Sequence, residues 1–358
     1  MHEQMERERR LRDETRAVWA TVGCFVVGVV GGALILGGGS RPLTGEGSLA
    51  MPAAVIAGLV AAAAFLTSTL MHRRGETAPM PRWQATVSDF SALALTLAFG
   101  AVTMMGVLLA TQVLSAGLEG LRLAALGGGL LTGVAAAVGG RFAFGAGVGL
   151  RTADLAALLF GFLVIGTLFA MVTAADPRWW EANFSQLGSG SWAFNGTLVV
   201  AGLLIATVGS YIGRDLHRML GDAALGRIAG VVALWAGTGA ALAAVGLLPL
   251  HRAPVPHDIA AFATLVLFAA AAVATVTAIP ATPQALLITS IGVGLLVVVA
   301  VVLWLGFRLY STTVVEAVVV GLGLLWMATL VRVLAILSPD RSRPSARRAL
   351  LPRPSSRR

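Results

Sequence analysis

Two polar segments of the chain carry side chains that could do hydrolytic chemistry: Asp176 and Ser185 in the first, His251 and His257 in the second. A serine becomes a nucleophile when a base lies within hydrogen-bond reach of its hydroxyl. In the catalytic hypothesis, Ser185 or a metal-bound water attacks a lipid or cell-wall intermediate. Asp176 and the two histidines then act as base, orienting group or metal ligands, as in a hydrolase or transferase.

The two histidines are weak candidates for a metal site. A stretch with two prolines separates His251 from His257, and this is not the spacing of two ligands on one helix face. Only the geometry of the loops could bring them to Asp258 or Asp176. We therefore predict no metal ion and no other cofactor.

Further polar and aromatic residues accompany these segments in the second half of the chain. The candidates for ligand binding are Trp179, Trp180, Asn183, Ser185, Asn195, Arg252, Asp258 and Glu316. A site built from them would bind a ligand without having to transform it. The sequence has no catalytic signature beyond the residues above, so we favour a protein that is not an enzyme.

Each binding candidate also has a structural interpretation. The tryptophans could anchor helices at the level of the lipid headgroups. Ser191 or Asn195 could cap the helix that follows them, since such side chains accept from free backbone amides. The carboxylate of Glu316 could pair with Arg308 or Arg252.

Ten long apolar stretches position these residues. Their predicted ranges are 18–38, 50–71, 91–116, 121–140, 153–175, 193–213, 227–248, 258–279, 285–306 and 313–337. A helix needs about 20 apolar residues to cross the hydrocarbon layer of a bilayer. The sequence therefore predicts an all-α, polytopic transmembrane helix bundle with about ten spans.

The basic residues predict the orientation of the spans. All 26 are arginines, and most fall in the segments that are cytoplasmic if the N-terminus is cytoplasmic. The arginines on the opposite side are Arg41, Arg122, Arg178, Arg252 and Arg308. This positive-inside bias predicts that both termini are cytoplasmic and that the Ser185 segment faces outward.

Composition agrees with a membrane protein: 57% of the residues are hydrophobic, 12% are charged, and the mean hydropathy is +0.85. The net charge of +9 comes from arginines that set the orientation of the spans and contact anionic lipid headgroups. We therefore expect membrane lipids as partners and no nucleic acid. The lone Cys24 excludes a disulfide framework. Arginine without lysine suggests a bacterial, actinobacterial origin, and we expect the inner (plasma) membrane.

The middle of the predicted spans carries no charged residue or histidine that we can place there, whereas ion paths and proton relays usually need one. A haem carrier and a proton-driven pump are therefore disfavoured.

Small residues repeat at helical spacing in two pairs, Gly28 with Gly32 and Gly129 with Gly133. We interpret both pairs as helix-packing contacts rather than as a dimer interface.

The segment Trp179-Trp-Glu-Ala-Asn-Phe-Ser-Gln-Leu-Gly188, followed by Ala-Phe-Asn195-Gly, resembles the outer loop of domain-of-unknown-function family 998. That family comprises bacterial and archaeal multi-pass membrane proteins with a Ser-x-Leu-Gly element and a following Asn. Its later outer loop with Pro and His is similar to the segment 249–258 here. The resemblance covers about residues 150–337 and implies an architecture and candidate residues without a reaction.

The predicted organisation has four parts: a cytoplasmic head (1–17), a four-span extension (18–148), a six-span module (149–337) and a basic disordered tail (338–358).

Three classes of function stay open. We favour a non-enzymatic module that binds a lipid, a solute or a protein partner at its outer polar cluster. The alternatives are a transporter or permease of a small or lipophilic solute, and an outer-leaflet hydrolase or transferase.

Overall fold

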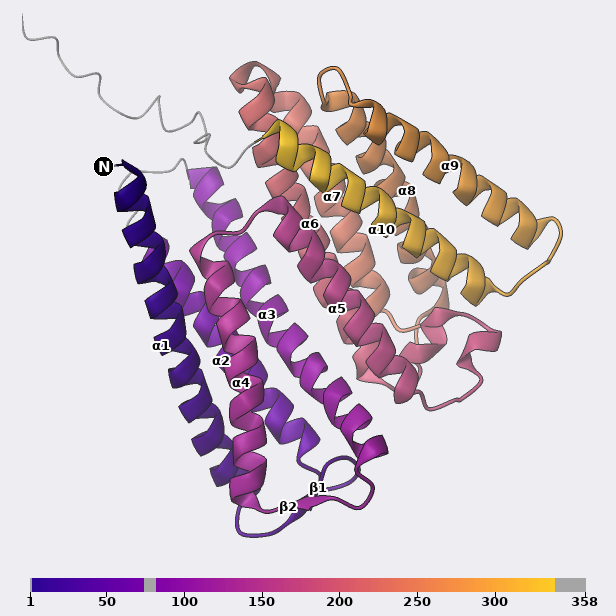
Figure 1. Ribbon diagram of the computed structural model, residues 1–358. Helices are drawn as coiled ribbons and strands as arrows, with labels where there is room; N and C mark the ends of the chain where they lie inside the picture. Colours follow the sequence, from indigo (N-terminus) through magenta and orange to yellow (C-terminus); the bar gives the residue numbers. More distant parts are fainter. Residues whose placement is uncertain (1, 74–81, 339–358) are drawn as a thin grey trace, which may run out of the picture. The chain divides into compact units, whose positions relative to one another are not determined.

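The computed structural model describes residues 2–73 and 82–338, and within them it contains ten helices that are long and apolar enough to cross a membrane (Figure 1). The predicted ten-span helix bundle is confirmed. The helices are α1 (His2–Leu36), α2 (Ala50–Arg73), α3 (Arg82–Gly117), α4 (Ala125–Val148), α5 (Thr152–Val172), α6 (Trp192–Leu220), α7 (Leu225–Leu247), α8 (Pro254–Ala278), α9 (Gln284–Leu305) and α10 (Thr312–Leu337). The predicted tail lies, from residue 339 onward, outside the described residues.

Several helix boundaries differ from the prediction, among them those of α1, α4 and α6 and the start of α3, which begins at Arg82 rather than near residue 91. Helix α1 already begins in the charged head, and α6 continues to Leu220 instead of ending near residue 213. Helix α4 spans Ala125–Val148 rather than 121–140, because residues 122–123 form a strand, β2 (Arg122–Leu123), that pairs antiparallel with β1 (Arg41–Pro42). Arg141 therefore lies within α4, where its guanidinium donates to the Glu14 carboxylate of α1 at 2.6 Å.

The chain forms two compact units. The first contains α1, α2, α4 and most of α3, the second contains α6 to α10, and the residues of α5 are divided between the two units. Residues 176–190 between α5 and α6, and the helices α6 to α10, belong to the second unit.

Close helix packing in the first unit depends on the two predicted glycine pairs. A Cβ atom on Gly28 would lie 2.8 Å from the Cα atom of Gly133, and one on Gly32 would lie 3.0 Å from the Cα atom of Gly129. The glycines thus let the backbones of α1 and α4 approach each other directly. This confirms that the two pairs serve packing.

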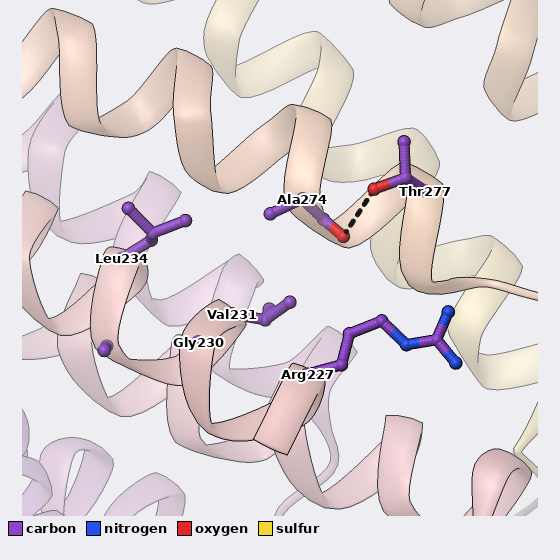
Figure 2. A pocket seen from close by; sticks show the side chains of 7 residues that line it. Arg227, Gly230, Val231, Leu234, Ala274 and Thr277 are labelled. Atoms are coloured by element: carbon purple, nitrogen blue, oxygen red, sulfur yellow. Dashed lines mark hydrogen bonds between the residues drawn. The ribbon is translucent and has the colours of Figure 1, made fainter. Parts of the chain in front are cut away.

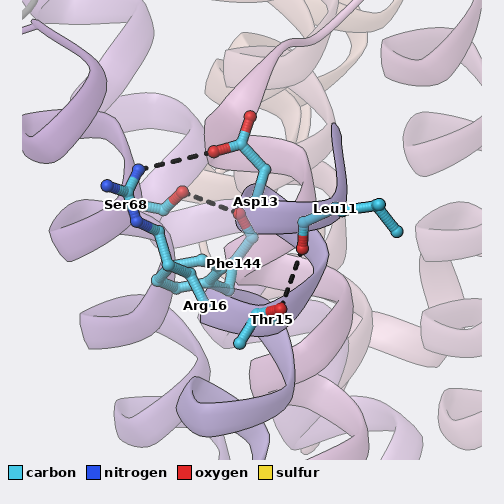
Figure 3. Close-up of polar contacts among 6 residues, drawn as sticks. All are labelled: Leu11, Asp13, Thr15, Arg16, Ser68 and Phe144. Atoms are coloured by element: carbon cyan, nitrogen blue, oxygen red, sulfur yellow. Dashed lines mark hydrogen bonds and ion pairs between the residues drawn. The ribbon is translucent and has the colours of Figure 1, made fainter. Parts of the chain in front are cut away.

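Polar contacts add to this packing (Figure 3). The Ser68 hydroxyl of α2 donates to the Phe144 carbonyl of α4 at 2.7 Å, in a buried position. Within α1, the Thr15 hydroxyl donates to the Leu11 carbonyl and Arg16 pairs with Asp13. The Ser68 bond links two helices, whereas the two α1 contacts are local and exposed.

The second unit combines a glycine contact with an aromatic core. Gly202 of α6 and Gly239 of α7 face each other so closely that a Cβ on either would clash with the carbonyl oxygen of the other. Trp235 of α7 is fully buried, and its ring lies edge-on to Phe268 of α8 and stacks on Trp326 of α10. These contacts hold α6, α7, α8 and α10 together and fix the ends from which the site residues project.

Candidate functional site

The loop between α5 and α6 contains two short 3-10 helices, η1 (Trp179–Glu181) and η2 (Phe184–Gly188). We call residues 176–190 the cap. Two hydrogen bonds join the cap to the first turns of α10: the Thr313 hydroxyl donates to the Trp180 carbonyl at 2.8 Å, and the Phe184 amide donates to the Glu316 carboxylate at 2.7 Å. Because Thr313 and Glu316 are three residues apart, they lie on one helix face and hold both 3-10 helices.

A third contact joins the cap to α8. The Nε2 atom of His257 lies 2.8 Å from the Ser185 hydroxyl oxygen, and its Nδ1 atom lies 2.8 Å from the Leu248 carbonyl oxygen. A carbonyl oxygen can only accept, so Nδ1 carries a proton, and in the neutral imidazole Nε2 then accepts from the Ser185 hydroxyl. The imidazole is almost fully buried, at 3% exposure.

The sequence around His257 explains its position. Helix α8 begins at Pro254, a residue that is favoured in the first turn because its missing N–H would have no helical partner. His257 therefore falls in the first helical turn, where its amide donates to the Ala253 carbonyl at 3.0 Å.

The Ser-x-Leu-Gly element has a separate structural reason at each position. Ser185 bonds His257, and Leu187 is buried at 1% exposure. A Cβ atom on Gly188 would lie 2.3 Å from the Asn195 side-chain oxygen, so only glycine fits there. The Asn195 amide nitrogen donates to the Gly188 carbonyl at 3.1 Å and fastens the cap to the first turn of α6.

Two of the structural interpretations are settled by these contacts. Ser191, and not Asn195, caps α6, since its hydroxyl accepts from the Ala193 amide. The expected ion pair of Glu316 with Arg308 or Arg252 is wrong within the described part of the chain. The carboxylate instead accepts from the Phe184 amide of the cap.

Within the described part of the chain, several candidates from the sequence make no hydrogen bond with the cap residues that bond α6, α8 and α10. Asp176 is exposed and accepts from the Arg178 amide at 2.8 Å, and His251, Arg252 and Asp258 are exposed near the start of α8. Residues 2–73 and 82–338 contain no group of three His, Cys, Asp or Glu side chains placed to hold a metal ion. The hypothesis that His251 and His257 bind a metal together gains no support.

The two tryptophans of the cap differ. The Trp179 ring packs on Phe184 with a centroid distance of 5.3 Å, whereas Trp180 is 55% exposed. Asn183, between the two 3-10 helices, has a buried side-chain oxygen with no hydrogen-bond partner among the described residues. Asn183 is therefore the one cap candidate with unused hydrogen-bonding capacity in a buried position.

A second polar cluster lies at the opposite end of the same unit, and the sequence interpretation missed it. Asp215, in the last turns of α6, is 6% exposed. Its carboxylate accepts from the Thr152 hydroxyl and lies 3.5 Å from the Arg218 guanidinium. The i,i+3 spacing of Asp215 and Arg218 would indicate an ion pair on one helix face. It was missed because both residues lie beyond residue 213, where the span was predicted to end.

The fold and the site define a multi-pass α-helical membrane protein in which a loop between two spans is fastened to three helices by partly buried polar contacts. Over residues 155–333, half of its length, the chain matches the family "Protein of unknown function (DUF998)", and it belongs to this family. The match includes every cap contact described above, and it confirms the resemblance found in the sequence. No curated protein and no solved structure matches the chain.

Proposed function

We propose that the protein is a non-enzymatic binding module of the plasma membrane that holds a polar group at the cap, on the outer face of the bilayer. The observation that carries the proposal is the buried Asn183 oxygen. A buried acceptor without a partner costs about 1–3 kcal/mol, and a donor group on a ligand would offset this cost.

The surroundings of Asn183 favour a ligand that offers donors. Glu316 carries an acceptor-only carboxylate when it is ionised, and only one cap amide is bonded to it. The exposed side chain of Trp180 adds an apolar surface to the same cap. A hydroxyl or amine on a lipid headgroup or on a small solute has the matching chemistry.

Native mass spectrometry of the full-length protein, purified gently from membranes, tests this proposal. We expect one discrete bound species on the wild type and its retention by Asn183→Asp, which keeps the acceptor oxygen. Asn183→Leu should reduce occupancy about 2- to 10-fold, the equivalent of one net hydrogen bond. If wild type and Asn183→Leu carry the same mixture of bulk lipid, the proposal is wrong.

A second candidate function is favoured by the Ser185–His257 contact. In an acyl transfer, the Ser185 oxygen would bond to an ester carbonyl carbon while its proton passes to His257 Nε2, and the leaving alcohol would take that proton. Water would then release the acyl group. The Leu248 carbonyl provides the correct tautomer, although it lacks the charge of the carboxylate in a catalytic triad.

A fluorophosphonate probe separates the two functions, because it labels activated serines covalently. Under the binding proposal, Ser185 stays unlabelled in the wild type and in His257→Gln. Labelling of Ser185 that disappears in His257→Gln would establish the second function in place of the first.

A further inference from the structure

A groove lies between α7 and α8, at the end of the second unit opposite the cap (Figure 2). Its volume is about 460 Å³, within the range of roughly 300–1,000 Å³ that small-molecule sites occupy. The lining residues are Arg227, Gly230, Val231, Ala233, Leu234, Ala274 and Thr277. All but Arg227 and Thr277 are apolar.

Small residues open the groove. A Cβ atom on Gly230 would meet no atom within 4 Å, and Ala233 and Ala274 add only methyl groups to the walls. From Arg227 to Leu234 the helix rises about 10 Å. The groove therefore extends from the end of the span into the depth that lipid acyl chains occupy.

The polar end of the groove is cationic. Arg227 is exposed, and its guanidinium makes no hydrogen bond or ion pair with another described residue. In Figure 2 its side chain extends beside the end of α8, where the Thr277 hydroxyl is already bonded to the Ala274 carbonyl. The guanidinium is thus the one lining group with spare donors, and a guanidinium matches a phosphate in both charge and geometry.

We propose that this groove binds an anionic phospholipid of the cytoplasmic leaflet, with the lipid phosphate on Arg227 and the start of one acyl chain along Gly230, Val231 and Leu234. The apolar walls favour a lipid over a water-soluble phosphate compound. Basic pockets between transmembrane helices on the cytoplasmic side are sites of this kind. The proposal is independent of the ligand of the cap, which lies at the other end of the unit.

Native mass spectrometry of the delipidated full-length protein in detergent tests the groove, by titration with phosphatidylglycerol and with phosphatidylcholine of the same acyl chains. The wild type should bind one phosphatidylglycerol in preference to phosphatidylcholine. Arg227→Gln should weaken phosphatidylglycerol binding about fivefold, the effect of one basic residue at a membrane surface, and weaken phosphatidylcholine binding less, because the choline cation opposes the guanidinium. Arg332→Gln removes an exposed arginine of α10 outside the groove and should change neither affinity.

A second pair of variants tests the apolar part. Gly230→Leu should fill the groove and weaken both lipids, whereas Gly321→Leu, at an equally open position of α10, should weaken neither. Equal losses of phosphatidylglycerol in Arg227→Gln and Arg332→Gln would show general surface charge and overturn the proposal. Unchanged binding in Gly230→Leu would overturn it as well.

Discussion

Asp215→Ala is expected to lower the free energy of unfolding by about 3–5 kcal/mol, the usual effect of removing one partner from a buried ion pair. The variant deletes the carboxylate that accepts from Thr152 and that lies 3.5 Å from the Arg218 guanidinium. The Arg218 side chain is only 11% exposed, so water does not replace the lost partner well. A chemical or thermal unfolding curve of the purified protein in detergent measures the loss.

An exposed ion pair in the same unit provides the matched control. Asp154 lies 3.7 Å from Arg151 with the same three-residue spacing at a helix end, although the arginine comes first here, and both side chains are about half exposed or more. Asp154→Ala should therefore cost about 0–1 kcal/mol. If the two alanine variants unfold alike, the Asp215 cluster does not stabilise the protein as described.

Glu316→Ala is expected to release the cap from α10. The Phe184 amide loses its acceptor, and a hydrogen bond to a charged group contributes about 1.5–3 kcal/mol. The cap should then become a site of rapid cleavage in limited proteolysis, between residues 176 and 190, with the rest of the chain still protected. Binding of the cap ligand should fall in parallel.

Glu316→Gln separates the hydrogen bond from the charge. The glutamine oxygen can still accept from the Phe184 amide, so we expect the cap to stay protected from proteolysis. Thr313→Val removes the neighbouring bond to the Trp180 carbonyl and should loosen η1 more than η2. Equal protection of the cap in Glu316→Ala and in the wild type would contradict the described role of the carboxylate.

The number of spans could be predicted because each crossing needs a long apolar run, and this signal is local. Helix ends were less predictable. The sequence Gly139-Gly140-Arg141 resembles the end of a span, yet α4 continues through it. The glycines admit the neighbouring side chains of Thr103 and Cys24, and the arginine has Glu14 as a partner. Neither contact is visible in the local pattern.

The residues of the cap could be predicted in part, but their contacts could not. Ser185 and His257 stand out as chemically capable residues, and the family resemblance marks the same segments. Their pairing depends on how η2 meets the first turn of α8, and spacing alone does not specify that geometry. For Glu316, opposite charges suggested an arginine, but a backbone amide was the partner. Backbone groups carry no sequence signal, so pairings of this kind are missed.

Labelling of single cysteines in intact cells tests the central claim most directly, namely that the cap faces outward and the Arg227 end faces the cytoplasm. Cys24 is the only cysteine, and Cys24→Ala provides the background. Ala182→Cys in the cap and Ala223→Cys between α6 and α7 are matched, exposed positions at opposite ends of α6. A membrane-impermeant maleimide should label the first in intact cells and the second only after lysis. The reverse pattern, or equal labelling of both in intact cells, would contradict the account.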